Sequence, residues 1–352
     1  MNTLIVPCAG KSSHFPNMKP KWMLTHPDGN LMIQKSLSGL NLEIFDRIVI
    51  TIVKPHCDEY DAHIILGQAF ENNKKVELCI LDDFTKSASE TIYLTLKKMN
   101  IEGHFVIKDS DNYVKTELPD KIKNYVIGCN LNDYPEISNV FAKSFLILNE
   151  QNMIQDIIEK KVVSNIISVG VYAFENAEVF KNTYLELIGK NIQGELFISH
   201  IISYLLSKHN IIFEALMAEG YEDWGTIKEW QKVQEKHRTY FIDLDGVIYK
   251  NCGKYGKTNW SNNTVFLENN IEKIKELQSK GGQIIITTSR SEEYRNELEK
   301  TLKEIGIEYS AILMGLNHSA RVVINDFAPT NPYPSAIAIS LPRDSSLKPY
   351  LK

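Results

Sequence analysis

The chain has 352 residues, of which 43% are hydrophobic and 24% are charged; this composition is typical of globular proteins, and the length favours two domains. The formal net charge of −5 gives no signature of binding to polyanions, so we expect no nucleic-acid partner. The sequence has no apolar run of membrane-spanning length, and its five cysteines are scattered, so we expect a cytoplasmic protein with reduced thiols, no signal peptide and no membrane insertion.

Short β-branched runs alternate with segments of helical periodicity, which predicts two doubly wound α/β domains with mainly parallel sheets. In the first domain we expect strands at 3–7, 47–53, 76–81, 104–107, 124–128, 142–148 and 168–174. Its expected helices cover 32–39, 56–70, 88–99, 175–188, 196–207 and 226–237. The second should have strands at 240–244, 283–287, 310–313 and 322–324, and helices at 269–280 and 291–305. We place the boundary at a polar helix end, which gives domains of residues 1–236 and 237–352.

A small, polar loop follows the first expected strand. It consists of Ala9, Gly10, Lys11, Ser12, Ser13 and His14. Such a loop lets backbone N–H groups approach phosphates closely, although most glycine- and serine-rich turns are only turns. A short step further on, Lys21 could neutralise the charge of a departing pyrophosphate, and its alternative is a solvated basic turn. We therefore expect this loop to bind a nucleotide and Lys21 to be catalytic.

Asp109 and Asp111 follow an expected apolar strand, at an edge where ligands of parallel α/β sheets bind. Gly170, Tyr172, Glu195 and Asp223 become candidates through a family resemblance. Each has an ordinary structural alternative. Glu195 would be favoured in the first turn of a helix by the helix dipole, and Asp223 would serve as a helix N-cap.

The segment LIVPCAGKSSHFPNMKPKWML resembles the signature of sugar-phosphate nucleotidyltransferases, a glycine-rich loop followed by Pro-Lys-x-Leu. The later pieces occur in the family's order, so the resemblance covers roughly residues 1–236. It implies Mg²⁺ ligands at Asp223 and at Asp111 or Asp109, with Asp111 favoured because Asp-Asn follows the family pattern. The sequence departs from the pattern at His14. The family carries an arginine there that binds a triphosphate through a bidentate contact, and a histidine cannot reproduce that contact.

The resemblance also implies the substrate contacts and the reaction. Gly170, Tyr172 and Glu195 would lie beside the sugar, and Ser87 and Ser89 would lie near the nucleobase. A sugar- or polyol-phosphate oxygen would attack the α-phosphate of a nucleoside triphosphate in line, with release of pyrophosphate. By analogy with the carriers of polyols and acid sugars, CTP is the preferred donor, although the 87–91 segment does not separate the bases.

The second domain opens with FIDLDGVIYK, in which two aspartates stand one residue apart at the end of an expected strand. Alternate strand residues point to opposite faces, so the strand must end near Asp243 for Asp245 to curl back to the same point. That geometry suits a Mg²⁺-assisted aspartyl nucleophile with a second carboxylate as acid and base. Thr288 ends a later expected strand, and Arg321 and Asp326 bracket the strand expected at 322–324.

These four pieces resemble the motifs of the haloacid dehalogenase superfamily of phosphatases. The resemblance implies that Asp243 is the nucleophile, that Asp245 is the acid and base, and that Thr288 bonds the phosphoryl group. Arg321 would be the cationic residue, for which Lys303 is an alternative, and Mg²⁺ would bind Asp243, Asp245 and Asp326. The gaps between the motifs leave no room for a cap domain. The structural alternative for Thr288 is a cap for the helix that follows.

Three hypotheses follow for the whole chain. The first is a bifunctional nucleotidyltransferase and phosphatase for activated sugars or polyols, because the fusion resembles proteins of bacterial capsule gene clusters. Its partners would be a nucleoside triphosphate and a sugar or polyol phosphate, and self-association is common among such enzymes. The second is a glycosyltransferase that uses Asp109-Ser110-Asp111 as its metal motif. The third is a chain in which one domain is a degenerate binding module. His14 motivates this hypothesis for the first domain, and the short last phosphatase motif at Asp326 motivates it for the second.

Overall fold

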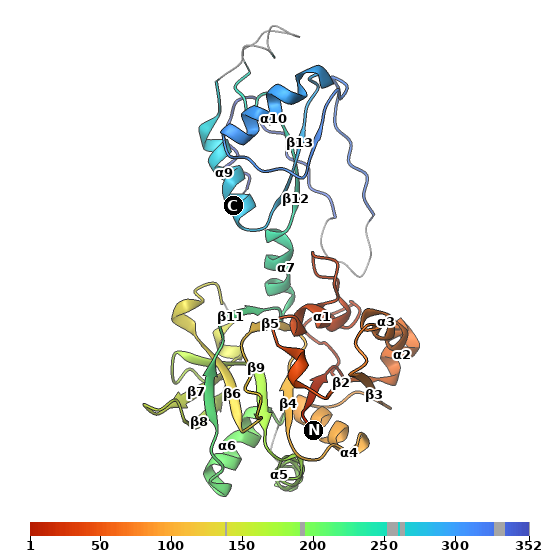
Figure 1. Ribbon diagram of the computed structural model, residues 1–352, viewed down its shortest axis with the longest axis vertical. Helices are drawn as coiled ribbons and strands as arrows, with labels where there is room; N and C mark the ends of the chain where they lie inside the picture. The colour runs from red at the N-terminus through yellow and green to blue at the C-terminus, as the bar shows by residue number, and fades with distance from the viewer. Residues whose placement is uncertain (138, 191–193, 252–259, 261–264, 327–334, 352) are drawn as a thin grey trace. The chain divides into compact units, whose positions relative to one another are not determined.

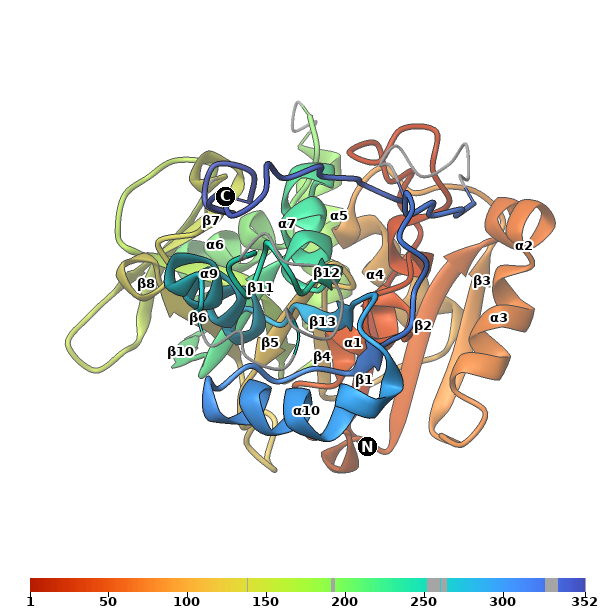
Figure 2. The same ribbon diagram turned by 90° about the horizontal axis from the view of Figure 1, so that it is seen from above.

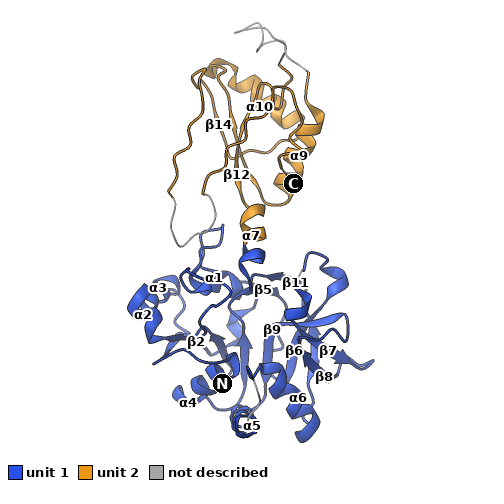
Figure 3. Ribbon diagram, turned by 180° about the vertical axis from the view of Figure 1, so that it is seen from behind, with its two compact units in different colours: residues 1–230 blue, residues 231–352 orange. Residues whose placement is uncertain are grey.

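The computed structural model describes residues 1–137, 139–190, 194–251, 260, 265–326 and 335–351. They form two compact units, Met1–Trp230 and Gln231–Lys352, coloured separately in Figure 3. The division falls within helix α7 (Ile227–Lys236), whereas we expected it at the end of that helix. Within the described parts of the chain, no helix is both long enough and apolar enough to cross a membrane.

The first unit is built around a mixed sheet with the strand order β10-β6-β9-β4-β1-β2-β3. Its strands are β1 (Thr3–Pro7), β2 (Arg47–Val53), β3 (Val76–Leu81), β4 (Phe105–Lys108), β6 (Tyr125–Asn130), β9 (Ile166–Phe174) and β10 (Glu214–Met217). β1 pairs in parallel with β2 and β4, and β2 pairs in parallel with β3. In contrast, β9 runs antiparallel to β4 and β6. The hairpin of β7 (Ser144–Leu148) and β8 (Ile154–Glu159) joins β9 through β7. A separate ribbon pairs β5 (Asn112–Lys115) with β11 (Gly220–Asp223).

Both faces of this sheet are buried, which explains why β1 and β2 are almost continuously apolar. The helices are α1 (Met32–Leu37), α2 (Lys54–Tyr60), α3 (Ala62–Ala69), α4 (Ala88–Lys98), α5 (Ala177–Gly189) and α6 (Ile198–His209). Alternate residues serve the two faces: Leu4 and Val6 pack with α1 and α3, and Ile5 packs with α4, α5 and α6. Figures 1 and 2 show α2 and α3 beside β2 and β3 at one end of the sheet. Short 3₁₀ helices cover Lys21–Met23, Leu42–Ile44, Leu131–Asp133 and Val140–Ala142.

The second unit contains a three-stranded parallel sheet with the order β12-β13-β14. Its elements are β12 (Thr239–Asp243), α9 (Glu268–Ser279), β13 (Gln283–Thr287), a 3₁₀ turn (Glu292–Tyr294), α10 (Arg295–Glu304) and β14 (Ala311–Leu313). Residues such as Ile242, Ile274, Ile286 and Leu302 form its core. Strand–helix–strand units of this kind give the parallel α/β architecture that the alternating pattern predicted.

Two element predictions are wrong. The helix expected at 56–70 is two helices, because Asp61 takes a left-handed conformation (φ 51°) between α2 and α3, which aspartate tolerates better than most residues. The strand expected at 322–324 does not form: Val322, Val323 and Ile324 are 80%, 61% and 92% exposed. An apolar triplet becomes a strand only where a neighbouring strand provides hydrogen-bond partners.

Candidate active site

The loop after β1 and the residue Lys21 are joined directly. The main-chain N–H of Lys21 donates to the hydroxyl of Ser12 at 3.3 Å. Gly10, Lys11, Ser13 and His14 are exposed, whereas Cys8 and Ala9 are buried beneath them. The side chain of Lys21 points to the end of β4, where its Nζ lies 2.5 Å from Oδ2 of Asp111. The structure thus brings the predicted lysine from the loop to the predicted acidic corner.

The ribbon of β5 and β11 brings Asp111 and Asp223 together although they are far apart in the sequence. Asp223 pairs in register with Asn112, and the main-chain N–H of Trp224 donates to the carbonyl oxygen of Asp111 at 3.0 Å. Trp224 is fully buried and so anchors this end of the ribbon. Asp223 is not the N-cap of α7: its Oδ1 accepts from the N–H of Gly225, and the N–H of Glu229 donates to Thr226.

Gly225 shows how close the two carboxylates are. A Cβ placed on this glycine would lie 3.2 Å from Oδ1 of Asp223 and 3.4 Å from Oδ2 of Asp111. Both carboxylates therefore face one small space, which a side chain at residue 225 would fill.

Asp109 has different surroundings. Its main-chain N–H donates to the carbonyl of Gly170 at 2.8 Å, and a Cβ on Gly170 would lie 2.5 Å from its Oδ2. Burial, followed by the charge of Asp111, raises the pKa of Asp109 well above its usual value. Burial acts on Asp111 in the same direction, but Lys21, Lys143 and Lys108 together outweigh it, and the pKa of Asp111 lies below its usual value. Of the two predicted alternatives, Asp111 is the one that faces Asp223.

Two further lysines that the sequence analysis missed line this corner. The Nζ of Lys143 lies 2.5 Å from Oδ2 of Asp223 and 3.2 Å from the hydroxyl of Tyr221. Lys108 is fully buried, and its ammonium group donates to the carbonyl oxygens of Asp109 and Asn112 and to Oδ1 of Asn112. Burial lowers the pKa of Lys108. Neither lysine belongs to a local motif, so only the tertiary contacts identify them.

The donor set fits a hard divalent cation. Mg²⁺ prefers oxygen ligands and is usually held by one or two carboxylates together with waters and substrate phosphates. Asp111 and Asp223 supply two such carboxylates facing one space. No group of three histidine, cysteine, aspartate or glutamate side chains suited to a metal occurs among the described residues. A cation here would therefore depend on phosphate oxygens for part of its coordination.

The predicted sugar-side residues occupy different environments. Tyr172 lies on β9 and is only 7% exposed, and burial raises its pKa well above the usual value. Glu195 is exposed, yet surrounding protein atoms raise its pKa, while Lys160, His14 and Lys21 act in the opposite direction. Glu195 is therefore close enough to the loop and to Lys21 to interact with their charges.

The serines predicted near the nucleobase are engaged within the protein. Ser87 caps α4 by accepting from the N–H of Glu90 at 3.1 Å. The buried hydroxyl of Ser89 donates to the carbonyl of Leu196 at 2.7 Å, so it is not available to a ligand in this structure. The segment before α4 still adjoins the loop, because the N–H of Thr85 donates to the carbonyl oxygen of Ala9.

In the second unit, β12 ends at Asp243 and Asp245 follows it, as predicted, but the partner of Asp245 is a residue that the sequence analysis did not select. Asp243 is the last residue of β12 and is exposed. Asp245 accepts two hydrogen bonds from the guanidinium of Arg290, at 2.6 and 3.0 Å. The Arg290 side chain is only 5% exposed and also packs 4.7 Å from the ring centre of Tyr249. The sequence analysis did not select Arg290, whose only signal was its position just after a strand end.

Thr288 is not the helix cap that we considered as its alternative, because no described side chain caps the 3₁₀ turn (Glu292–Tyr294) or α10. Thr288 is 1% exposed, and its hydroxyl accepts from the N–H of Arg290 at 3.1 Å. The guanidinium of Arg321 donates to Ser289 and to the carbonyls of Asn317 and Ser319. Surrounding protein atoms raise the pKa of Asp243 above its usual value, and the charge of Arg321 offsets only part of that rise. Asp326 is exposed and does not end a strand, because the expected strand is absent.

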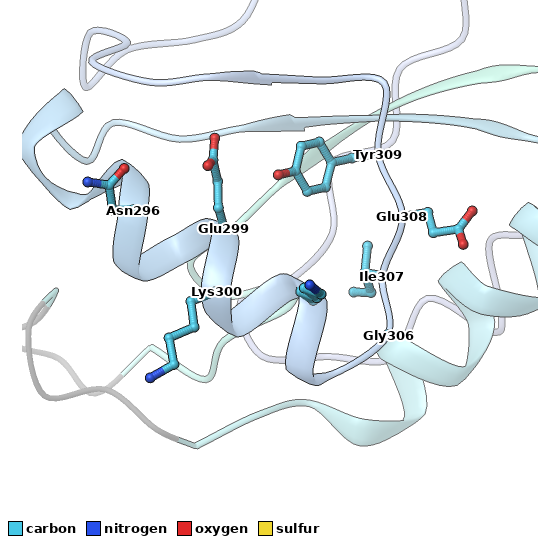
Figure 4. A pocket seen from close by; sticks show the side chains of 8 residues that line it. Asn296, Glu299, Lys300, Gly306, Ile307, Glu308 and Tyr309 are labelled. Atoms are coloured by element: carbon cyan, nitrogen blue, oxygen red, sulfur yellow. The ribbon is translucent and has the colours of Figure 1, made fainter.

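Figure 4 shows a surface hollow of about 690 Å³ in the same unit. Glu299, Lys300 and Lys303 of α10 line it together with Glu308 and Tyr309. The segment that lines it leads into the start of β14, whereas Asp243 lies at the opposite, carboxyl end of the parallel sheet. The hollow is therefore not part of the carboxylate site.

Comparison with solved structures relates this fold to nucleotidyltransferases. A nucleoside-diphosphate-sugar pyrophosphorylase from Vibrio cholerae RC9 is 18% identical, with a TM-score of 0.54, over 65% of this chain and 98% of its own. A Bacillus anthracis protein assigned as a glucose-1-phosphate thymidylyltransferase is 17% identical, with a TM-score of 0.53, and the match covers 66% of this chain and 94% of that protein. A UDP-glucose pyrophosphorylase is 14% identical, with a TM-score of 0.50, and the match covers 66% of this chain and 97% of that protein.

No model of a known protein family matches the sequence, and no curated protein sequence matches it. The structural matches cover about two thirds of the chain, a share that corresponds in size to the first unit. That part of the chain has the mixed α/β fold of the nucleotidyltransferases. At these identities, the likeness establishes the fold alone.

Proposed function

We propose that the first unit transfers a nucleotidyl group from a nucleoside triphosphate to a sugar or polyol phosphate. The observation that carries this proposal is the meeting of Asp111 and Asp223 beside Lys21, at the end of the strand next to the polar loop. Two carboxylates and an ammonium group at one point suit the handling of a triphosphate and its cation. The nucleotidyltransferase fold of this part of the chain supports the same conclusion.

The chain's own residues position the reactants. The loop of residues 9–14 would hold the triphosphate through backbone N–H groups, and Ser12 keeps Lys21 at its edge. The Lys21 ammonium would stabilise the negative charge that develops as pyrophosphate leaves. Asp111 and Asp223 would hold Mg²⁺, which neutralises phosphate charge during the transfer. Gly170, Tyr172 and Glu195 would border the acceptor, with Glu195 as the exposed polar group among them.

The positions of the two aspartates after β4 favour nucleotidyl transfer over glycosyl transfer. A glycosyltransferase that used Asp109 and Asp111 as one metal motif would direct both side chains to the cation. Here Asp109 packs against Gly170, and Asp111 faces Asp223. We keep CTP as the preferred donor, and a role in surface-polysaccharide supply, as parts of the proposal that rest on analogy.

For the second unit we propose phosphatase activity of the haloacid dehalogenase type, with Asp243 as the nucleophile. The exposed carboxylate of Asp243 at the carboxyl end of a parallel sheet supports it. Asp245 would act as acid and base only after Arg290 releases it, because both of its oxygens now accept from that guanidinium. Arg321, which interacts with the charge of Asp243, would bind the phosphoryl group, and Asp326 would complete the Mg²⁺ site by moving toward β12.

The first experiment measures pyrophosphate release with Mg²⁺ from protein carrying Asp243→Asn, so that phosphatase action does not consume products. The four common nucleoside triphosphates are each tested against a panel of sugar and polyol phosphates. One active pair would support nucleotidyl transfer and identify donor and acceptor together. No pyrophosphate from any pair, with phosphate release by the unmutated protein intact, would leave a phosphatase with a nucleotide-sugar-binding unit.

His14 allows a test of the remaining alternative, a degenerate first unit. It stands where the nucleotidyltransferase family that the sequence resembles carries an arginine, and it is exposed at the end of the loop. If the unit has lost activity through this change, His14→Arg should restore pyrophosphate release to a protein that otherwise shows almost none. Strong release by the unmutated protein would exclude degeneracy.

A further inference from the structure

Lys143 is a charged residue at the candidate site to which the proposed transfer assigns no role. Its ammonium group contacts Asp223 at 2.5 Å and Tyr221 at 3.2 Å. On the other carboxylate, Lys21 makes the matching contact with Asp111 at 2.5 Å. Each carboxylate that would hold the cation is therefore paired with a lysine. The Lys143 side chain is 15% exposed, so it borders the space that a substrate would enter.

The two lysines reach this point from opposite sides of β4. Lys21 follows β1 and is bonded to the proposed nucleotide loop through Ser12. Lys143 directly precedes β7, which pairs with β9. In the sheet, β4 lies between β1 and β9. Because the loop assigns the β1 side to the nucleotide, Lys143 lies on the side that remains for the acceptor.

A cation would disturb the contact between Lys143 and Asp223. An ammonium group and a divalent cation repel each other strongly when both lie within a few ångströms of one carboxylate. The four-carbon stem of lysine allows its charged group to swing to a new partner. The acceptor brings an anion, its phosphate group, to the same side of the site.

We propose that Lys143 binds the phosphate group of the acceptor and that Asp223 holds it in place until the cation arrives. The inference rests on the proposed nucleotidyl transfer, since it takes Asp223 as a cation ligand and a phosphate ester as acceptor. It predicts that cation and phosphate bind cooperatively, because each favours the arrangement in which Lys143 has left Asp223. By linkage, each ligand then raises the affinity of the other by the same factor.

The test titrates Mn²⁺ into the full-length protein with and without inorganic phosphate, on the Asp243→Asn background to weaken any cation site in the second unit. With Lys143 present, phosphate should raise the Mn²⁺ affinity about fivefold or more. Lys143→Met should bind Mn²⁺ more tightly than its parent without phosphate, and phosphate should no longer raise that affinity. Lys143→Arg should retain part of the coupling. Lys115→Met, which alters an exposed lysine on β5 paired with Glu219, should behave like the parent.

The inference is overturned if Lys143→Met binds Mn²⁺ no more tightly than its parent, or if phosphate raises the affinity of both proteins equally. A parent protein that binds no Mn²⁺ overturns it together with the proposed cation site. These titrations contain no nucleotide, so pyrophosphate release judges the proposed function separately. In an active enzyme, Lys143→Met should raise the KM for the acceptor at least about tenfold and leave the KM for the nucleotide within about twofold. An equal rise in both constants would contradict the assignment.

Discussion

Asp109 and Asp111 show how neighbouring residues of one type acquire different properties. Both follow β4, and both are drawn toward a higher pKa by burial. Lys21, with help from Lys143 and Lys108, reverses that effect for Asp111, whereas Asp109 packs against the backbone of Gly170 and keeps its raised pKa. Their partners, rather than their residue type, separate a charged candidate ligand from a carboxyl group with a structural role.

The first prediction tests this separation. Asp111→Asn and Asp223→Asn should each lower kcat/KM for pyrophosphate release at least about a hundredfold, because each removes a charge from the proposed cation site. Asp109→Asn keeps the shape of its side chain and should cost less than about tenfold. Steady-state kinetics with the active substrate pair provides the measurement. A greater loss for Asp109→Asn than for Asp111→Asn would reverse our choice of ligand.

The second prediction concerns His56, a buried residue whose Nδ1 has no hydrogen-bond partner among the described residues. Burial lowers the pKa of His56 to about 4, against the opposing effect of Glu59. In the unfolded chain the imidazole takes up a proton near pH 6.5. Between these values the unfolded state binds more protons, so the free energy of unfolding should fall as the pH drops from about 6.5 to about 4.

Urea unfolding at several pH values tests this effect with two variants. His56→Phe should show a smaller loss of stability over that range than the unmutated protein. His63→Gln, which alters an exposed histidine on α3, should leave the pH dependence unchanged. If the free energy of unfolding falls equally steeply with decreasing pH in His56→Phe and in the unmutated protein, another group causes the acid sensitivity.

Two elements hold the candidate site together, the ribbon of β5 and β11 and the irregular middle of β9. The ribbon sets Asp223 opposite Asn112, next to Asp111. In β9, Gly170 has a φ of +76° and supports Asp109 through its carbonyl group. Both features orient the turn after β4, so changes in either should alter activity by moving Asp109 and Asp111.

Gly170→Ala provides the third prediction. Its Cβ would lie 2.5 Å from Oδ2 of Asp109 and 2.7 Å from Nδ2 of Asn112, at a φ that side chains rarely adopt. We expect a loss of about 1–3 kcal/mol in the free energy of unfolding and a large loss of pyrophosphate release. Gly189→Ala is the matched control: at the end of α5 its Cβ would meet no described atom within 4 Å, and stability should change by less than about 1 kcal/mol. Equal effects of the two substitutions would contradict this account.

At the scale of the whole molecule, the chain contains two compact units with separate cores and separate sets of candidate residues. Lys21 and its carboxylates belong to the first, and Asp243 and Arg290 to the second. The two proposed activities should therefore respond independently to substitution.

The fourth prediction follows from this independence. Lys21→Met should lower kcat for pyrophosphate release about a hundredfold or more and leave phosphate release within about twofold. Asp243→Asn should do the reverse, because it removes the proposed nucleophile. Both activities are measured on the same preparations. Loss of both activities from either single substitution, with folding intact by circular dichroism, would show that the units depend on each other.

Sequence alone determined the features that depend on local pattern. The bounds of β1, β2, β3 and β13 agree with the predicted ranges, because short β-branched runs between polar turns have few alternatives. The polar loop and the aspartates after β4 were also selected from the sequence, since each follows a recognisable strand, and Lys21 was selected because it stands a short step past the loop. The α/β class and the nucleotidyltransferase-like fold of the first unit followed from the order of these pieces.

Tertiary structure decided which of these residues meet. The strands β5, β10 and β11 were missed, because each has only four residues and pairs with a segment far along the chain. β8 was also missed, although it pairs with the neighbouring β7. The ribbon of β5 and β11 matters most for the site. That pairing joins Asp223 to Asp111. Lys143 and Arg290, which contact candidate carboxylates, have no motif to identify them. Local sequence sets the preference of a segment, but the contacts of a charged side chain depend on residues far along the chain, and only the folded structure brings those together.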